Sequence, residues 1–80
     1  MVKSAATMAI VAMRRLKTFL KLNHKKKGSI DIFVHPHVAQ RLVNEDVSPL
    51  DSLRKRFRRH IAVVSDDKLH VEDINIEFAR

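Results

Sequence analysis

The residues of this sequence with the chemistry of a metal site are its histidines. His35 and His37 are two positions apart, and His24, His60 and His70 lie elsewhere in the chain. A protein metal site needs three or four ligands, and no third ligand stands at a fixed spacing from this pair. We therefore expect no metal and no other cofactor, and we expect His35 to stand at the start of a helix.

Paired carboxylates are the residues with the chemistry of acid–base catalysis. Asp66-Asp67 and Glu72-Asp73 are such pairs, but they fall in a predicted turn and at its exit, where Asp commonly shapes the backbone. The sequence has no glycine-rich phosphate loop, no nucleophile motif and no cysteine, so the groups of an active site are missing. We expect no catalytic residue and no enzymatic activity from this chain alone.

Positive charge is concentrated in the first third of the chain. The net charge is +7, yet residues 28–80 hold eight basic and nine acidic side chains and are close to neutral. Residues 1–27 hold no acidic side chain, and a segregated basic segment of this kind favours phosphate or an acidic surface as partner. Its basic residues are Lys3, Arg14, Arg15, Lys17, Lys21, Lys25, Lys26 and Lys27.

A second basic cluster, residues 54–59, places five cations around Phe57. Such a run is commonly a solvated helix face, but it also suits contacts to a phosphate backbone, which carry no base preference. With four Phe and no Tyr or Trp, the chain lacks the side chains of a base-stacking platform. We therefore predict weak, sequence-tolerant and salt-dependent RNA binding. The predicted phosphate contacts are Arg14, Arg15, Lys17, Lys21, Lys25, Lys26, Lys27, Arg54, Lys55, Arg58 and Arg59.

The elements that must position these residues begin with a long amphipathic helix. Ser4 is a suitable N-cap, and the helical pattern runs to about Asn23, followed by a basic turn at residues 25–28. Apolar residues recur at three and four positions and predict one buried stripe. The stripe consists of Ala5, Met8, Ala9, Ala12, Leu16, Phe19 and Leu20.

The apolar face of this helix is wider than one packing partner needs. Ile10, Val11 and Met13 extend it beyond the buried stripe. A helix that is apolar over more than half of its circumference usually packs against two surfaces. We therefore predict self-association through these three residues, either with another subunit or with a nuclease domain that this chain lacks.

Two short helices follow a predicted strand at residues 30–34, where Ile30, Ile32 and Val34 alternate with other residues. Pro36 and Pro49 each occupy a first helical position, and Ser48 is the expected cap of the second of these helices. Residues 44–46 are expected to break the chain between them. The predicted inward residues are Val38, Ala39, Leu42 and Val43 in the first helix, and Leu50, Leu53 and Phe57 in the second.

Two further strands, at residues 61–64 and 74–78, are expected to close the chain as a hairpin. The predicted fold class is α+β, with the order α-β-α-α-β-β and a three-stranded antiparallel or mixed sheet that carries the helices on one face. Residues 1–80 are expected to form one domain, made of a basic helix and turn (1–27) and a β-αα-ββ body (28–80). The first helix would lie across the sheet or bridge to a neighbour.

The order of these elements resembles the ribonuclease E/G family, although no single motif is diagnostic. The opening residues 2–7 with Arg14-Arg15-Leu16 resemble the segment just after the zinc-link of that family. Residues 34–39 with 42–45, residues 50–57, and residues 61–64 with Asp67 and 69–72 resemble the strand, helices and closing hairpin that follow.

The resemblance implies a truncated C-terminal small domain, which helps to assemble protomers and does not cut RNA. The zinc-link cysteines, the Mg²⁺-binding acids, the RNA-binding barrel and the sensor of the 5′-phosphate belong to upstream parts of such enzymes and cannot be mapped here. The expected role is therefore oligomer assembly and electrostatic RNA scaffolding in RNA processing or decay. We expect a cytoplasmic location and no membrane partner, since no apolar run approaches the ~20 residues of a membrane span.

Two alternatives follow from the same patterns. The β-αα-β order is also that of KH-type RNA-binding modules, which clamp the RNA backbone through a GXXG loop. The corresponding residues 44–48 contain no glycine and two acids, which would repel phosphate. Residues 1–27 also have the basic, acid-free composition of an organelle-targeting helix, but their apolar arc is too broad for that role.

Overall fold

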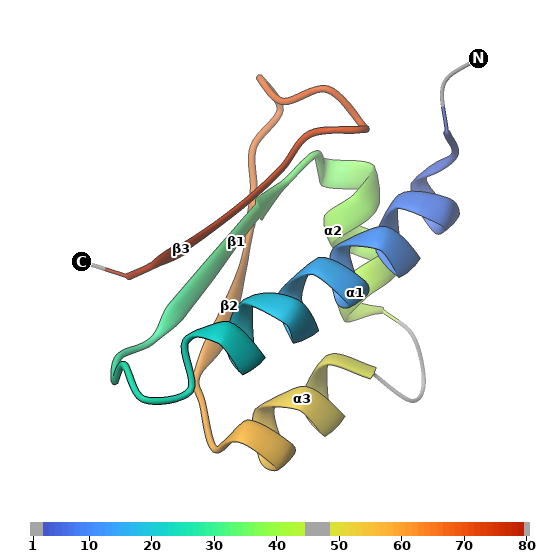
Figure 1. Cartoon of the computed structure of the whole chain (residues 1–80). Coiled ribbons are helices and arrows are strands. Elements are labelled where there is room, and N and C mark those ends of the chain that lie inside the picture. Colours follow the sequence, from blue (N-terminus) through green and yellow to red (C-terminus); the bar gives the residue numbers. More distant parts are fainter. Residues whose placement is uncertain (1–2, 45–48, 80) are drawn as a thin grey trace.

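The helical and strand patterns of the sequence form the elements that they predict. The computed structural model describes residues 3–44 and 49–79, and it has the predicted α+β class and element order (Figure 1). The elements are α1 (Ala5–Leu22), β1 (Ile30–Val34), α2 (Pro36–Val43), α3 (Pro49–Phe57), β2 (Ile61–Ser65) and β3 (Ile74–Phe78).

The sheet is mixed, and β1 is its central strand. The strand order is β2-β1-β3, with β1 parallel to β2 and antiparallel to β3 (Figure 1). The predicted hairpin of the last two strands is therefore wrong, because β2 and β3 lie on opposite sides of β1. Residues 66–73 pass over the end of β1 instead, where the Asp66 N–H donates to the Val34 carbonyl at 2.9 Å. This arrangement gives the most deeply buried strand hydrogen-bonded neighbours along both edges.

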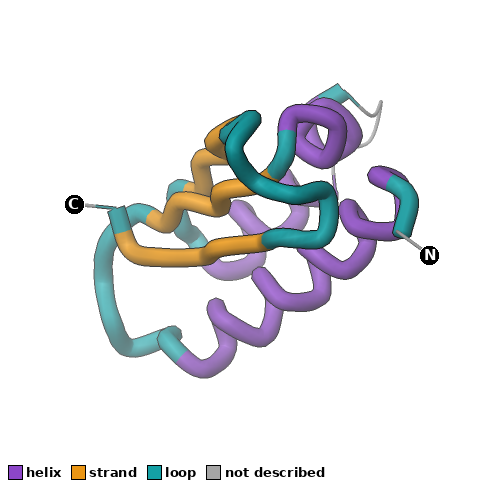
Figure 2. Tube along the Cα trace, turned by 90° about the horizontal axis from the view of Figure 1, so that it is seen from above, coloured by secondary structure: helices purple, strands orange, loops and turns teal. Residues whose placement is uncertain are grey.

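The helices lie on one side of the sheet, as Figure 2 shows from above. The alternation in β1 is confirmed, since Ile30, Ile32 and Val34 are buried while the residues between them are half-buried. α1 packs against α2, α3 and β3, so the basic N-terminal helix is an integral part of the core. Within the described residues, no helix is both long enough and apolar enough to cross a membrane.

The buried stripe of α1 is confirmed, and its extra apolar residues divide into two groups. Ser4 caps the helix, and its side chain accepts a hydrogen bond from the Thr7 N–H. Val11 and Met13 are half-buried and pack against the core of this same chain, while Ile10 remains 63% exposed. The stripe residues Met8, Ala12, Leu16 and Leu20 are buried, and Ala5, Ala9 and Phe19 are half-buried against them.

The two short helices also follow their patterns, with one exception. Val38, Ala39 and Leu42 are buried in α2, but Val43 is 53% exposed and its predicted burial is wrong. Val43 is the last residue of α2, and the helical rotation of about 100° per residue places it about 40° beyond Ala39, at the edge of the buried face. In α3 Leu50 and Leu53 are buried and Phe57 is half-buried, as predicted. The expected cap at Ser48 and most of the expected break between the helices lie outside the described residues.

The same small truncation should cost more stability in the central strand than at an exposed residue of α1. We expect Ile32→Val to lower the free energy of unfolding by about 0.5–1.5 kcal/mol, because it removes a methyl group from a side chain that is 1% exposed. Ile10→Val makes the same chemical change on the surface and should cost less than about 0.5 kcal/mol. Urea unfolding of both variants measures the difference. Equal losses of stability would contradict the burial of Ile32 in β1.

Candidate nucleic-acid interface

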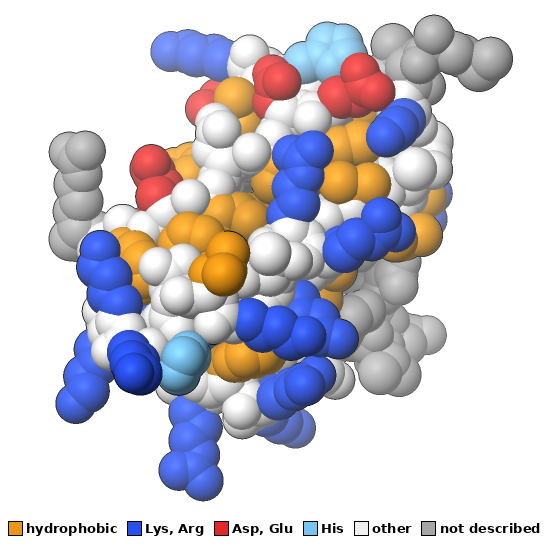
Figure 3. Space-filling model, in the orientation of Figure 1, with side chains coloured by type: hydrophobic (Ala, Val, Ile, Leu, Met, Phe, Trp, Pro, Cys, Tyr) orange, Lys and Arg blue, Asp and Glu red, His pale blue; other side chains and the backbone are white. Residues whose placement is uncertain are grey.

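The two basic turns and the acid-rich β2–β3 connection lie at opposite ends of the sheet. On the face shown in Figure 3, Lys and Arg side chains crowd the lower part, over the C-terminal end of α1 and over α3. The acidic side chains of the same face lie in its upper half. Among the described acids, Asp66, Asp67, Glu72 and Asp73 belong to the β2–β3 connection, which lies at the other end of the sheet.

Two turns form the basic end, and hydrogen bonds hold them together. Residues 23–29 follow α1, and residues 58–60 follow α3. The Ile30 N–H donates to the His60 carbonyl at 2.9 Å. Arg59 links the turns further, because its Nη1 donates to the Gly28 carbonyl at 3.0 Å and its Nη2 to the Asn23 carbonyl at 3.2 Å. The two turns therefore form one connected wall.

Between these turns lies a hollow of about 420 Å³, which we call the basic groove. Its lining includes four permanent cations, and none of the described acidic residues takes part in it. A smaller hollow of about 320 Å³ adjoins it and is lined by Arg54, Arg58, Arg59 and His60. The residues that line the basic groove are His24, Lys26, Lys27, Gly28, Ser29, Phe57, Arg58, Arg59 and His60.

The two turns both use left-handed backbone, with different residues. Gly28 has φ +128°, and a Cβ at this position would lie 3.8 Å from the Phe78 ring, so the conformation and not the space requires glycine. Arg58 has φ +50°, immediately after the last residue of α3. The Arg59 N–H closes this helix end by donating to the Arg54 carbonyl at 3.1 Å, which is the long-range bond of a Schellman motif. Glycine is the usual residue at the position that Arg58 occupies.

The Phe78 ring carries cations on the sheet side of the basic end. The Lys26 Nζ lies 4.4 Å from the ring centroid, and the Arg59 guanidinium carbon lies 5.8 Å from it. Phe19 packs against the same ring with a centroid distance of 5.2 Å. Attraction between a cation and the face of an aromatic ring contributes about 0.5–1 kcal/mol at exposed sites, so these contacts orient Lys26 and Arg59.

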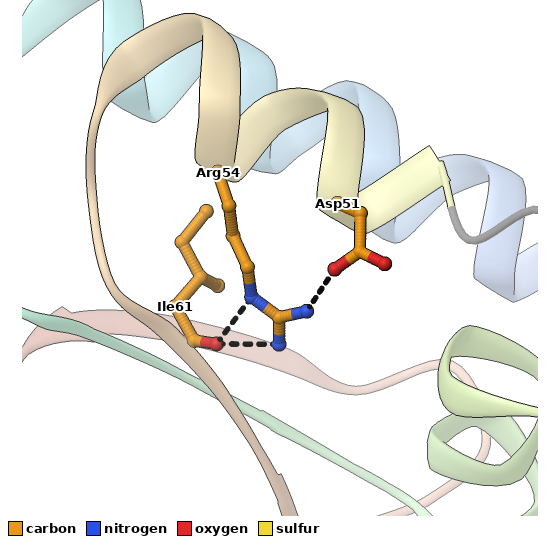
Figure 4. A network of polar contacts seen from close by, with 3 residues as sticks. All are labelled: Asp51, Arg54 and Ile61. Carbon is orange, nitrogen blue, oxygen red and sulfur yellow. Dashed lines mark hydrogen bonds and ion pairs between the residues drawn. The ribbon is translucent and has the colours of Figure 1, made fainter.

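The hydrogen-bond donors of Arg54 bind groups of the domain itself. Its Nε and Nη2 donate to the Ile61 carbonyl at 3.1 and 2.7 Å, and its Nη1 contacts Asp51 Oδ1 at 2.8 Å (Figure 4). This side chain therefore fastens α3 to the first residue of β2. Arg59 has a similar role between the two turns, so two of the predicted phosphate-contacting residues also hold the fold together.

The remaining predicted phosphate contacts are exposed, but the structure brings only part of them together. Lys26, Lys27 and Arg58 join Arg59 in the lining of the basic groove. Sequence reasoning missed His24, Ser29 and His60 as members of this lining. They are sequence neighbours of the two basic runs, but no sequence signal indicates that the runs meet. The exposed predicted residues outside the groove lining are Arg14, Arg15, Lys17, Lys21, Lys25 and Lys55.

The histidine pair has a structural role at the start of α2. The His35 side chain caps the helix, because its Nδ1 accepts a hydrogen bond from the His37 N–H at 3.1 Å. The two rings pack edge to face, with centroids 4.8 Å apart. In the described part of the chain, no group of three or more His, Cys, Asp or Glu side chains has the arrangement of a metal site.

The paired carboxylates shape the β2–β3 connection, as predicted. Asp66 Oδ1 accepts a hydrogen bond from the Lys68 N–H at 3.0 Å, and Asp73 Oδ2 accepts one from the His70 N–H at 2.9 Å. Both contacts are local bonds from a side chain to the backbone, which is the usual role of Asp in turns.

Comparison with known proteins gives one family. The model of the RNase E/G, thioredoxin-like domain matches residues 1–79. No curated protein and no solved structure gives a significant match.

This match corrects the resemblance drawn from the sequence. The family name was right, but the assignment to a C-terminal small domain that follows the zinc-link is wrong, because the matched domain is the thioredoxin-like one. The match also leaves the KH-like alternative without support. Residues 45–48, which would form most of a KH-type loop, lie outside the described residues.

The contacts of Arg54 predict a loss of stability that its charge alone would not cause. We expect Arg54→Met to lower the free energy of unfolding by about 1–2 kcal/mol, because the Ile61 carbonyl loses two charge-assisted hydrogen bonds. Lys55→Met, a matched loss of one charge at the neighbouring exposed position, should cost less than about 0.5 kcal/mol. Equal urea midpoints for the two variants would show that the carbonyl contact contributes nothing.

The backbone of Arg58 predicts that a substitution at this position stabilises the fold. We expect Arg58→Gly to raise the free energy of unfolding by about 0.5–1 kcal/mol, because relief of the left-handed strain exceeds the entropy that glycine adds to the unfolded chain. Thermal unfolding of the variant measures the change, with Lys55→Gly as a control inside a right-handed helix that should be destabilised by about 1 kcal/mol. A destabilised Arg58→Gly protein would mean that the arginine side chain supports the fold.

Proposed function

The chain belongs to the RNase E/G thioredoxin-like domain family, and we propose that it serves a ribonuclease E/G-like protein as a non-catalytic domain for assembly and electrostatic RNA scaffolding. Its place of action is RNA processing or decay in the cytoplasm. Its partners are RNA and a second copy of the chain or the nuclease part of such a protein.

The observation that carries the RNA part of the proposal is the basic groove. Four permanent cations from two turns line one hollow, to which no described acid contributes. Exposed lysines and arginines of α1 and α3 extend the positive surface beside it. A surface of this kind attracts a phosphate backbone and releases its counterions, and it does not read bases.

Ile10 supports the assembly part. It is 63% exposed on α1. An interface through Ile10 would bury a side chain that this chain leaves in water, and burial of apolar surface drives most protein association. Val11 and Met13 take a smaller share, because they already pack against the core of their own chain.

The non-catalytic part of the proposal is supported by the roles of the acids and histidines. Asp66 and Asp73 bond the backbone of their own connection, and His35 caps α2. Groups engaged in this way are poorly placed for acid–base work, which requires a positioned side chain facing a substrate.

A titration of single-stranded RNA at two salt concentrations, on a sample whose mass is measured by light scattering, tests the proposal. We expect similar affinities for oligoadenylate and oligouridylate, and a fall of roughly 50-fold between about 50 and about 200 mM salt if four phosphates are contacted. We also expect a mass above that of the monomer, reduced by Ile10→Gln.

Several outcomes would contradict the proposal. Absence of binding at low salt, or a strong preference for one RNA sequence, would remove the electrostatic scaffold. A strict monomer at high concentration, both alone and in the presence of RNA, would remove the assembly role. Val43→Gln serves as the matched control for Ile10→Gln, because it makes a similar polar change at an exposed residue of another helix.

A further inference from the structure

We propose that the basic groove is a defined binding site for a single phosphate group of RNA, with Arg58 as its principal ligand. This inference rests on the proposed RNA role and adds to it a located site. The ligand chemistry is a phosphate, supplied either by an internal phosphodiester or by a terminal phosphomonoester.

Hydrogen bonds fix the walls of the groove before any ligand binds. Arg59 donates to the carbonyls of Gly28 and Asn23, and the Ile30 N–H donates to the His60 carbonyl. These bonds hold the 23–29 turn against the 58–60 turn, although the two are about thirty residues apart in sequence, as the separation of 31 between Arg59 and Gly28 shows. A site whose walls are already ordered loses less entropy on binding, so more of the contact energy appears as affinity.

The backbone of Arg58 adopts a conformation that is unfavourable for arginine. Its φ of +50° is a conformation that glycine adopts freely and that costs a residue with a side chain about 1–3 kcal/mol. No hydrogen bond from the Arg58 guanidinium to the described chain accompanies this cost, and the residue is exposed while it lines both hollows. Within the described chain this guanidinium has no hydrogen bond, ion pair or ring contact, whereas Arg58 lines both the groove and the second hollow.

The side chains of the lining have the chemistry of a phosphate site. A guanidinium presents two parallel donors that fit two phosphate oxygens, and such bidentate pairs are among the strong charge-assisted hydrogen bonds. Lys26, Lys27 and Ser29 line the groove from the other turn. The Lys26 Nζ lies over the neighbouring Phe78 ring, 4.4 Å from its centroid. The groove thus has cationic residues of two turns in one lining, which suits a compact anion.

The one Phe of the lining is poorly placed for stacking on a base. Phe57 is the aromatic side chain of the groove apart from its histidines, and it is half-buried against the hydrophobic core. Base stacking on a protein needs an aromatic face open to the nucleotide. Arg56, whose guanidinium carbon lies 5.5 Å from the Phe57 ring centroid, covers the ring further.

The test compares Arg58→Gly with Arg15→Ala, in the full chain, by titration with one RNA oligonucleotide carrying either a 5′-hydroxyl or a 5′-monophosphate. Both variants lose one positive charge, but Arg15 lies on α1 outside the groove lining. We expect Arg58→Gly to weaken binding about tenfold, the effect of one charge-assisted hydrogen-bonding group, while its thermal midpoint stays at or above that of the wild type. Arg15→Ala should weaken binding less than about threefold, as for a screened surface charge.

The two RNA forms identify the source of the phosphate. Tighter binding of the 5′-monophosphate form, with the preference lost in Arg58→Gly, would assign a terminal phosphomonoester. Equal binding of both forms, with an equal loss in the variant, would assign an internal phosphodiester. Both results support the site, and chemical shift changes in the amides of residues 26–29 and 58–60 on addition of inorganic phosphate would locate it.

The failures are distinguishable. Equal losses in Arg58→Gly and Arg15→Ala would overturn the groove as a site and leave the proposed electrostatic scaffold intact. A wild-type chain that binds neither RNA form would overturn the proposed RNA role itself. Loss of binding in Arg58→Gly together with a lowered thermal midpoint would also overturn the inference, because the side chain would then act through the fold.

Discussion

The parallel pairing of β1 with β2 is the constraint on which the rest of the structure depends. The N-terminal ends of neighbouring parallel strands lie at the same edge of a sheet, so the turns that lead into β1 and β2 must meet there. Those turns are residues 23–29, which include Lys25, Lys26 and Lys27, and residues 58–60, which include Arg58 and Arg59. The antiparallel strand β3 ends at the same edge and brings Phe78 beneath the cations. The acid-rich connection of residues 66–73 necessarily lies at the opposite edge, so the topology separates this connection from the two basic turns.

The local elements could be predicted from the sequence because local signals specify them. Ser4 and Pro36 mark helix starts, and the alternation of Ile30, Ile32 and Val34 identifies the buried face of β1. The pairing of strands could not be predicted in the same way. Two consecutive strands suggest a hairpin, but the connection 66–73 is long enough to pass over β1, and only the tertiary gain of two neighbours for the most deeply buried strand decides between these arrangements.

The basic groove lay outside the reach of sequence analysis for the same reason. Each basic run was visible, but their meeting follows from the pairing of β1 with β2 and not from any spacing along the chain. The resemblance to a family shows the same limit, since an ordered series of elements without a diagnostic motif led to the right family name and the wrong domain within it. Patterns of burial specify how a chain packs more firmly than they specify its place in a larger protein.

The arginines of the basic end differ in function although they are chemically identical. Arg54 and Arg59 donate to backbone carbonyls, and a guanidinium committed in this way stabilises the fold while it keeps its charge near the surface. Arg58 has no such contact with the described chain and occupies a backbone conformation better suited to glycine. The 23–29 turn has a glycine, Gly28, at its position of positive φ, whereas the 58–60 turn has an arginine at its own. In the proposed phosphate site, a side chain held at a conformational cost beside turns that Arg59 joins would distinguish the groove from a merely solvated basic surface.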